Sequence, residues 1–259
     1  MKIVSAVLRR IQTQLARPAF GRVKECCLCH RRLGRFLPFP GGWAGAPPVA
    51  RRLKITGSDL DRYQCPWCGC NDRERHLWLY LKHGGVFDKL AGKTVLHFAP
   101  EPRLTAAIAA AGPARHVQAD LFPASPAIEK VDMLAMPYAD ASFDFVIANH
   151  VLEHVADDGA ALREIRRILR PGGWAVLQTP YSAVLETTVG DPAVASREAR
   201  REHYGQDDHV RLFGRDIFNR ICAAGFVSRV SSHETALPGI DPGRFGVNRD
   251  EPFFLFERR

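Results

Sequence analysis

Short apolar runs alternate with amphipathic segments along the chain after residue 92. The runs predict strands at residues 94–98, 115–120, 143–149 and 174–179. Between these runs, residues 104–111 and 157–169 place apolar side chains at the spacing of a helix that buries one face. This alternation predicts an α/β fold in which helices cover both faces of a parallel sheet. A ligand is then expected beyond the carboxyl ends of the strands.

The pattern changes near the end of the chain. Residues 216–224 predict a helix that is closed by Gly225, and residues 226–231 and 252–256 predict two strands. The long loop between these strands contains several prolines and glycines. The two strands therefore indicate an antiparallel pair at one edge of the sheet.

Two amphipathic segments lie in the first third of the chain. Residues 2–16 carry an apolar stripe of Val4, Val7, Leu8, Ile11 and Leu15. The stripe is consistent with a helix that packs on a partner or neighbouring domain, a helix at a membrane surface, or a frayed terminus. Residues 73–90 predict a second amphipathic helix, whose aromatic side chains are expected in the core.

The composition is typical of a globular protein, and the charge is unevenly distributed. Of 259 residues, 46% are hydrophobic and 25% are charged, which excludes wholesale disorder, and no apolar run is long enough to span a bilayer. Residues 1–90 contain 17 Lys and Arg against 6 Asp and Glu, a net charge of +11. The remaining 19 basic and 22 acidic residues give −3, so a basic front module precedes a mildly acidic body.

Six of the seven cysteines lie in this basic module, and four of them form two Cys-x-x-Cys pairs. The pairs are Cys26 with Cys29 and Cys65 with Cys68. No convincing signal peptide precedes them, which indicates a reducing, cytoplasmic setting and disfavours disulfides. Two thiolates from each of two tight turns complete a tetrahedral site, for which a structural Zn²⁺ is the default ion.

Other interpretations of the cysteines remain open at this point. The gap of residues 30–64 is longer than in the simplest zinc pattern and is rich in proline and glycine. Cys27 is an alternative ligand to Cys26, and Cys70 is a possible bystander. Free buried cysteines, or a redox-active pair, are the competing interpretations of the whole set.

Three segments of the body carry a family resemblance. They are residues 132–144 (DMLAMPYADASFD), residues 149–155 (NHVLEHV) and residues 169–174 (LRPGGW). Together they resemble class I S-adenosylmethionine-dependent methyltransferases of the type 11-like group. The run His97-Phe98-Ala99-Pro100-Glu101, the pair of Cys65 and Cys68, and residues 205–211 (GQDDHVR) resemble a bacterial subgroup with an N-terminal four-cysteine zinc module. The resemblance implies a Rossmann-like seven-stranded sheet with a reversed final strand, preceded by a small zinc-ribbon-like module. The expected organisation is a helix over 1–20, a zinc-binding module over 21–72 and a methyltransferase domain over 73–259.

The resemblance also implies cofactor-binding residues at the ends of the predicted strands. Asp120 matches the acid that accepts hydrogen bonds from both ribose hydroxyls, and Leu121 follows it. Asp132 matches the acid that accepts from the adenine amino group, with Met133 beside the ring. Asn149 and His150 fall where the fourth strand ends and faces the methyl group.

One turn departs from the family pattern. The first strand of the domain runs into His97-Phe98-Ala99-Pro100-Glu101, where the family usually has an acidic residue and a glycine-rich turn. Glycine there normally allows the backbone to approach the ligand closely. Ala99 is expected to allow a similar approach, and Glu101 to replace the missing acid as the partner of the methionine ammonium group.

Two histidines are candidates for a general base. His150 is placed by the strand end, and His209 lies in a charged segment, with His203 and Tyr204 as nearby alternatives. Residues 181–211 are long and polar and are expected to form a lid over the acceptor site. The arginines of this segment are compatible with a phosphate- or carboxylate-bearing acceptor, or with a solvated helix face.

These observations predict an S-adenosylmethionine-dependent methyltransferase with a structural Zn²⁺. The expected acceptor is a small molecule or glycan-like metabolite. The alternatives are an RNA methyltransferase that docks through the basic zinc module, and a non-catalytic S-adenosylmethionine-binding protein.

Overall fold

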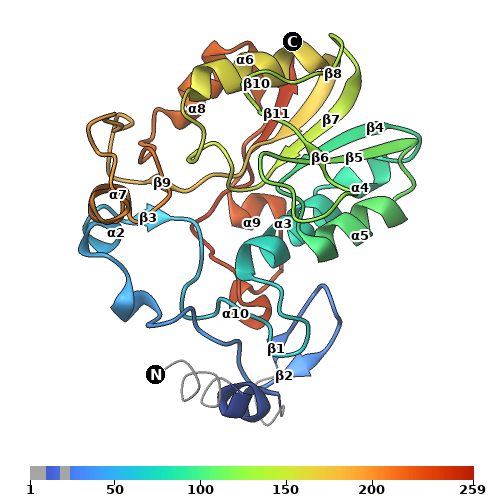
Figure 1. The fold of residues 1–259 in the computed structure, drawn as a ribbon. Helices are drawn as coiled ribbons and strands as arrows, with labels where there is room; N and C mark the ends of the chain where they lie inside the picture. The colour runs from blue at the N-terminus through green and yellow to red at the C-terminus, as the bar shows by residue number, and fades with distance from the viewer. Residues whose placement is uncertain (1–9, 18–23) are drawn as a thin grey trace.

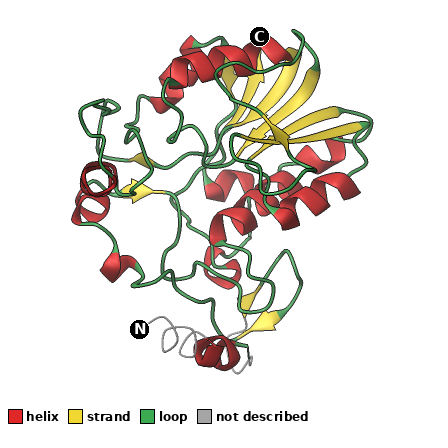
Figure 2. Ribbon diagram, in the orientation of Figure 1, coloured by secondary structure: helices red, strands yellow, loops and turns green. Residues whose placement is uncertain are grey.

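A seven-stranded sheet forms the centre of the computed structural model, which describes residues 10–17 and 24–259. Figures 1 and 2 show this sheet at one end of the molecule. Its spatial order is β10-β11-β8-β7-β4-β5-β6. The strands are β4 (Thr94–Phe98), β5 (Arg115–Asp120), β6 (Glu129–Lys130), β7 (Phe143–Ala148), β8 (Leu169–Val176), β10 (Phe226–Ser228) and β11 (Leu255–Arg258). Strands β6, β5, β4, β7 and β8 pair in parallel, and β11 runs antiparallel to both β8 and β10, which confirms the predicted fold class.

Helices cover both faces of the sheet, as the alternation predicts. Helices α3 (Asp72–His83), α4 (Val86–Lys89) and α5 (Pro102–Ala110) lie on one face, and α6 (Asp158–Ile168) and α8 (Ile217–Ala223) on the other. Neighbouring residues of β7 point to opposite faces, so that Phe145 packs with the first group and Val146 with the second. A strand that is buried on both faces reads as a continuous apolar run, which is why β7 is the clearest strand in the sequence.

Several element boundaries differ from the prediction. Strands β8 and β10 each end three residues earlier than predicted, β6 has no counterpart in the prediction, and the helix predicted over residues 73–90 is divided into α3 and α4. Strand β8 begins at Leu169, immediately after α6, because Leu169 pairs with Phe143 and the register then shifts before Trp174 pairs with Phe145. The Pro-Gly-Gly segment therefore lies in a bulge of the strand and not in a separate turn. Strand β11 starts at Leu255, three residues later than predicted, and inserts between β8 and β10.

The front of the described chain consists of a small hairpin and of residues 34–64, called the excursion below, which pack on the body. Strands β1 (Lys24–Glu25) and β2 (Arg32–Leu33) form the hairpin, which lies at the opposite end of the molecule from the sheet. The excursion contains the 3-10 helix η1 (Trp43–Gly45), α2 (Pro48–Arg52) and β3 (Ile55–Thr56). Strand β3 pairs with β9 (Tyr181–Ser182), which directly follows the end of the central sheet. Residues 43–56 are thus packed against the body, although the sequence groups them with the cysteines.

Arg75 of α3 joins the front module, the excursion and the C-terminal segment. Its buried guanidinium donates hydrogen bonds to five backbone carbonyls, those of Arg62, Tyr63, Cys70, Phe245 and Gly246. It also lies 4.0 Å from the centre of the Phe36 ring. Five N–H donors in a rigid plane suit arginine for this role, because each carbonyl satisfies one donor of the buried cation.

The remaining elements are short or lie partly outside the described residues. Helices α7 (Arg197–Tyr204), α9 (His233–Ala236) and α10 (Pro242–Phe245) complete the list. Residues 10–16 are helical, and Ile11 and Leu15 of the predicted stripe are 50% and 68% exposed. Val4, Val7 and Leu8 lie outside the described residues. Among the described helices, none combines the length and the apolar character that a membrane crossing needs.

Candidate active site

Four polar side chains follow four adjacent strands at the carboxyl edge of the sheet. Glu101 follows β4, Asp120 ends β5, Asp132 follows β6 and Asn149 follows β7. Because the sheet order is β7-β4-β5-β6, these residues are arranged along a single edge. This is the edge at which open α/β sheets bind ligands. The sequence prediction of their common location agrees with this arrangement.

The Glu101 carboxylate is held in a fixed position between two strands. It accepts a hydrogen bond from Asn149 Nδ2 at 2.5 Å and contacts His97 Nε2 at 3.1 Å. Burial would raise the pKa of Glu101, but the contacts with His97 and Asn149 hold it below its ordinary value. Glu101 is therefore an ionised, oriented acid. The predicted residue His97 is itself fully buried, so its side chain positions Glu101.

The backbone at this edge adopts the left-handed conformation at two residues other than glycine. Ala99 has φ +46° in the turn after β4, and His150 has φ +57° after β7. Such a conformation costs roughly 1 kcal/mol for a residue with a Cβ atom, and strained residues of this kind cluster at functional sites. The turn after β4 thus keeps the shape that glycine normally provides, with Ala99 in the strained position.

The two aspartates each use one oxygen to shape their own turn. Asp120 Oδ1 accepts from Phe122 N at 2.7 Å, and Asp132 Oδ1 accepts from Leu134 N at 2.9 Å. In the described part of the chain, no hydrogen bond is made to the second oxygen of either side chain. Both carboxylates are therefore oriented and available. The other predicted cofactor residues differ in exposure, since Leu121 is exposed whereas Phe98 and Met133 are buried in the core.

A cavity of about 400 Å³ lies next to this edge and contains both predicted histidines. One wall comes from the excursion and is mostly apolar, and it includes Phe39, Trp43, Pro47, Ile55 and Leu60. The opposite wall is polar and consists of residues from the body, among them Arg73, His150, Tyr204 and His209. A wider, open groove of about 1120 Å³ lies on the other side of β3 and contains neither histidine. The smaller cavity is therefore the candidate acceptor site.

His150 is clamped between two carboxylates. Its Nε2 atom lies 3.2 Å from Glu251 Oε1, and its Nδ1 atom lies 3.4 Å from Glu153 Oε1. Burial would lower the pKa of His150, but the two carboxylates raise it above its ordinary value. Burial would raise the pKa of Glu153, yet His150 holds it at about 2.

This clamp decides which role His150 is able to fill. An imidazole that faces an ionised carboxylate at each nitrogen carries both protons, and so it has no lone pair to accept another. His150 therefore presents a fixed positive charge at the cavity wall. The sequence prediction that it is a general base stays a prediction, and the geometry favours His209 for that role.

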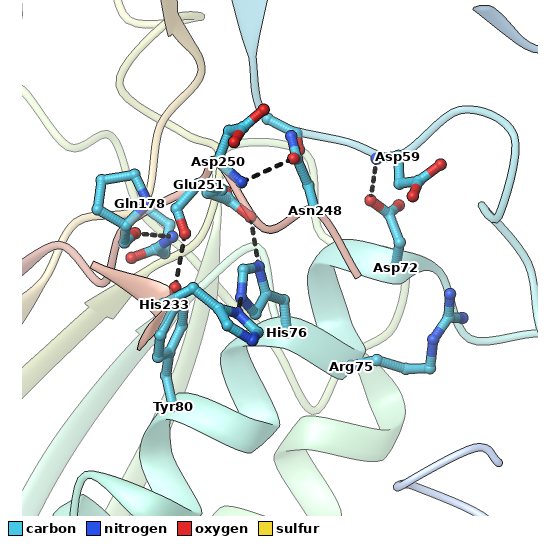
Figure 3. Close-up of polar contacts among 12 residues, drawn as sticks. Asp59, Asp72, Arg75, His76, Tyr80, Gln178, His233, Asn248, Asp250 and Glu251 are labelled. Carbon is cyan, nitrogen blue, oxygen red and sulfur yellow. Dashed lines mark hydrogen bonds and ion pairs between the residues drawn. The ribbon is translucent and has the colours of Figure 1, made fainter. Parts of the chain in front are cut away.

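A buried polar chain continues behind Glu251 and leads away from the cavity (Figure 3). Glu251 Oε2 lies 2.9 Å from His76 Nδ1, and His76 Nε2 lies 3.0 Å from His233 Nδ1. Tyr80 donates from its hydroxyl to the backbone carbonyl of Glu251 at 2.5 Å. Burial would raise the pKa of Glu251, but His150 and His76 hold it well below its ordinary value. The chain fixes Glu251, and through Glu251 it fixes His150.

His209 lies in the same cavity in a different chemical state. It is 6% exposed, and within the described residues its ring makes no hydrogen bond. It packs edge-on against His154, with ring centres 4.9 Å apart. Burial lowers the pKa of His209, so the ring is neutral near pH 7 and has a lone pair for a proton.

The predicted lid is ordered and is anchored at its end by Arg211. This side chain donates hydrogen bonds to the carbonyls of Leu152, Val155 and Ala156 in the turn after β7. The anchoring brings the residues just before Arg211 to the cavity. The two alternatives for a base are engaged elsewhere: His203 is exposed and contacts the Ala199 carbonyl at 2.9 Å, and the Tyr204 hydroxyl donates to the carbonyl of Asp191.

The four predicted metal-binding thiols converge at the other end of the molecule. The Sγ atoms of Cys26, Cys29, Cys65 and Cys68 all lie within 4.8 Å of one another. Two of their separations, Cys26–Cys68 at 3.8 Å and Cys29–Cys65 at 3.9 Å, match the edge of roughly 3.8 Å that Zn–S bonds of about 2.3 Å give a tetrahedron. The residues present therefore fit a structural zinc ion.

The two cysteines that the sequence leaves open differ in position. Cys27 points away toward the backbone carbonyl of Arg75, and burial raises the pKa of its thiol to about 12. Cys70 lies beside the cluster, 3.3 Å from Cys68 and 3.5 Å from Cys26. Cys26, and not Cys27, thus faces the other thiols from the first turn, and Cys70 is a fifth thiol at the edge of the cluster.

Sequence reasoning missed three contributors to the cavity and its support. Arg73 and Tyr63 line the polar wall, and Glu251 clamps His150 from a position 101 residues away in the chain. The sequence contained only a weak indication of Arg73, which is a basic residue at the start of an amphipathic helix and has no evident structural role there. No local pattern marks Glu251.

The central part of the chain is similar to known proteins. Residues 82–177 match the family model described as a methyltransferase domain. An uncharacterized 37.1 kDa transposon protein of Streptomyces fradiae is 37% identical over 101 residues, 38% of this chain and 28% of that protein. The malonyl-[acyl-carrier protein] O-methyltransferase of Halorhodospira halophila is 33% identical over 104 residues, 40% of this chain and 33% of that protein. The chain thus spans about a third or less of the length of these two relatives.

One solved structure is similar to this chain at lower sequence identity. It is the 1,6-didemethyltoxoflavin-N1-methyltransferase of Burkholderia thailandensis with bound 1,6-didemethyltoxoflavin and S-adenosylhomocysteine. The identity is 17%, the TM-score is 0.48, and the match covers 71% of this chain and 81% of that chain.

Proposed function

We propose that this chain, which carries a class I S-adenosylmethionine-dependent methyltransferase domain, transfers a methyl group from S-adenosylmethionine to a small molecule. One observation carries the proposal. His150, next to Asn149 at the end of β7, lines the acceptor cavity, while Asn149 bonds the carboxylate of Glu101 at the neighbouring strand end. A cofactor edge and an acceptor cavity thus meet at a single strand terminus.

The residues of the cofactor edge match the chemical groups of S-adenosylmethionine. The oriented Asp120 carboxylate is suited to the ribose hydroxyls and Asp132 to the adenine amino group, because a carboxylate accepts two hydrogen bonds. Glu101 is ionised and is suited to the methionine ammonium group. Leu121 supplies exposed apolar surface beside these acids, whereas Met133 is buried in the core. When bound, the cofactor supplies an electrophilic methyl group and a thioether leaving group.

His209 is the proposed general base for an acceptor that reacts through a hydroxyl or amine. Its neutral ring accepts the proton that the acceptor loses when its new bond to the methyl carbon forms. His150 serves as a fixed positive charge at the same wall. The remaining contribution of the chain is positioning, since the cavity orients the acceptor toward the strand end.

The enclosure of the cavity favours a small acceptor over a polymer. Its volume of about 400 Å³ falls in the range of small-molecule sites, and the excursion and the lid both contribute to its walls. A small molecule or glycan-like metabolite therefore remains the proposed acceptor. The hairpin of β1 and β2, whose loop contains Cys26 and Cys29, lies at the opposite end of the molecule from the sheet.

We further propose that Cys26, Cys29, Cys65 and Cys68 hold a structural Zn²⁺. Four thiolates close the coordination sphere, so the ion stabilises the module and takes no part in transfer. A site of four thiolates requires reduced cysteines, so a reducing, cytoplasmic setting is part of the proposal.

Two measurements test the proposal. Calorimetric titration of the zinc-replete protein with S-adenosylhomocysteine is expected to show binding in the micromolar range, and the absence of binding would refute the cofactor assignment. Incubation with methyl-labelled cofactor and fractionated cell extract is expected to label a product of low molecular mass. Label that is confined to RNA would overturn the small-molecule assignment.

A further inference from the structure

Two arginines line the cavity, Arg73 and Arg201, and within the described residues neither guanidinium makes a hydrogen bond or ion pair. Arg201 is exposed on α7, whereas Arg73 is half-buried at the start of α3. The other arginines nearby are engaged: Arg75 bonds carbonyls, Arg62 forms an ion pair, and Arg211 bonds the turn after β7. A partly desolvated cation without a partner is costly, and such a group is typically completed by a ligand.

The acidic groups near Arg73 are already engaged. Burial would lower the pKa of Arg73, but Tyr63, Asp72, Glu153 and Glu101 raise it, so all four lie near the guanidinium. Each of the three carboxylates already accepts a hydrogen bond from another group. Within the described residues none of them forms an ion pair with Arg73, so we expect an anion that pairs with it to come from a bound molecule.

The apolar wall of the cavity limits which molecules can bind beside Arg73. Phe39, Trp43 and Leu60 of the excursion face the cavity, and aromatic side chains bind the flat apolar faces of rings. The cavity therefore combines an apolar wall, a half-buried cation without a partner and a neutral base. These features select a compact molecule with an apolar face and a negative charge.

We infer that the acceptor is a small ring compound with an anionic substituent, a carboxylate or a phosphate, that pairs with the Arg73 guanidinium. This inference rests on the proposed methyl transfer, since it names the class of molecule that enters the same cavity. A guanidinium pairs with either anion through two parallel hydrogen bonds. Arg73 then holds one end of the acceptor, and the reacting group is directed to the part of the wall that contains His209.

The test compares charged and neutral probes on the full, zinc-replete chain. Binding of 4-hydroxybenzoate, phenyl phosphate and the neutral 4-hydroxybenzamide is measured by ligand-observed NMR, with and without S-adenosylhomocysteine. The two anions are expected to bind about tenfold more tightly than the amide, the usual scale for a charge-assisted contact. Comparison of the two anions shows whether the site prefers a carboxylate or a phosphate.

Three variants make the test specific. Arg73→Gln is expected to remove the preference for anions, and Arg73→Lys to retain part of it, because lysine keeps the charge without the planar fork. Arg201→Gln is the matched control, since Arg201 lines the same cavity from the exposed lid helix α7. Circular dichroism of each variant establishes that it is folded.

The outcomes separate this inference from the proposed function. Equal binding of anions and amide, or no binding of any probe, overturns the inference. So does loss of the preference in Arg201→Gln instead of Arg73→Gln. Weaker S-adenosylhomocysteine binding in Arg73→Gln, with anion binding unchanged, would assign Arg73 to the cofactor. If the wild type binds no S-adenosylhomocysteine but still captures anions through Arg73, the proposed function fails and the anion site stands.

Discussion

The cofactor edge and the acceptor cavity meet at His150 but are assembled in different ways. The edge takes its polar residues from the ends of four neighbouring strands within residues 94–149. The cavity takes its walls from residues 39–63, Arg73, Pro180 and residues 201–209. Hydrogen bonds between strands fix the edge, whereas side-chain contacts between distant segments fix the cavity. The edge is thus the more local and more rigid of the two.

The cysteine module supports only one of these regions. Cys29 and Cys65 flank the excursion, whose two ends are joined by backbone hydrogen bonds between Leu37 and Gln64. Farther along, Ser182 Oγ donates to the Leu53 carbonyl and Asn248 donates to the Gly57 carbonyl. A metal at the cysteines therefore holds the base of the cavity wall, while the strand ends do not depend on it.

Cys65→Ser is expected to have the largest effect and to separate the two regions. Zinc content should fall from about one ion per chain toward zero, because structural zinc contributes about 10–16 kcal/mol of binding coupled to folding in small modules. Capture of anionic probes should be lost, while S-adenosylhomocysteine affinity changes by less than about threefold. Metal analysis measures the zinc content and calorimetry measures the S-adenosylhomocysteine affinity, with Cys222→Ser as control. Equal loss of cofactor binding would show that the two regions form one unit.

His209→Gln is expected to slow transfer without weakening cofactor binding. Loss of a general base costs about 10²–10⁴-fold in rate. Because burial lowers the pKa of His209, the wild-type rate should stay level as pH falls from 8 to about 6.5 and decline only below that. Transfer of the labelled methyl group to the active extract fraction measures the rate and its pH profile. His203→Gln is the matched control on the exposed lid. An unchanged pH profile in His209→Gln would exclude it as the base.

Glu251→Gln is expected to destabilise the cavity side through the charge clamp. Removing the anion between His76 and His150 costs about 3 kcal/mol, roughly 6–12 °C in melting temperature. The pKa of Glu251 is held below its ordinary value, so its stabilisation is present above about pH 4.3 and is lost as pH falls further. The difference from wild type should therefore shrink between pH 5 and pH 3.

Thermal melts across this range test the clamp. Glu257→Gln is the control, because Glu257 forms an exposed pair with Arg229 that is worth at most about 1 kcal/mol. A loss of stability in Glu251→Gln that is the same at pH 3 and pH 7 would mean that shape, and not charge, explains the effect.

Asp120→Asn is expected to have the smallest effect and to act on the edge alone. Replacing a charged acceptor by a neutral amide should weaken S-adenosylhomocysteine binding by about tenfold. Binding of anionic probes should stay unchanged. Calorimetry and NMR measure the two affinities, with Asp88→Asn on the exposed α4 helix as control. Weaker probe binding in Asp120→Asn would show that the cofactor edge and the cavity are coupled.

The parallel core of the sheet and the two cysteine pairs follow from local sequence patterns. Alternation of apolar residues sets a strand, and parallel strands bring their ends to one edge. Asp120 and Asn149 lie at the ends of predicted strands, whereas Asp132 follows β6, which the apolar pattern does not predict, and is assigned from the family resemblance alone. The pair spacing likewise indicated Cys65 and Cys68, because two thiols of one tight turn face the same point.

The proposed roles of the histidines and the proposed selectivity of the cavity depend on tertiary contacts. Glu251 reaches His150 across 101 residues, and its effect on the imidazole depends on burial, which no local pattern encodes. Within the described chain, Arg73 has no ion-pair partner. This follows from the folded positions of Glu101 and Glu153, which bond other groups. Charge state and selectivity depend on which groups share a desolvated space, and folding alone brings those groups together.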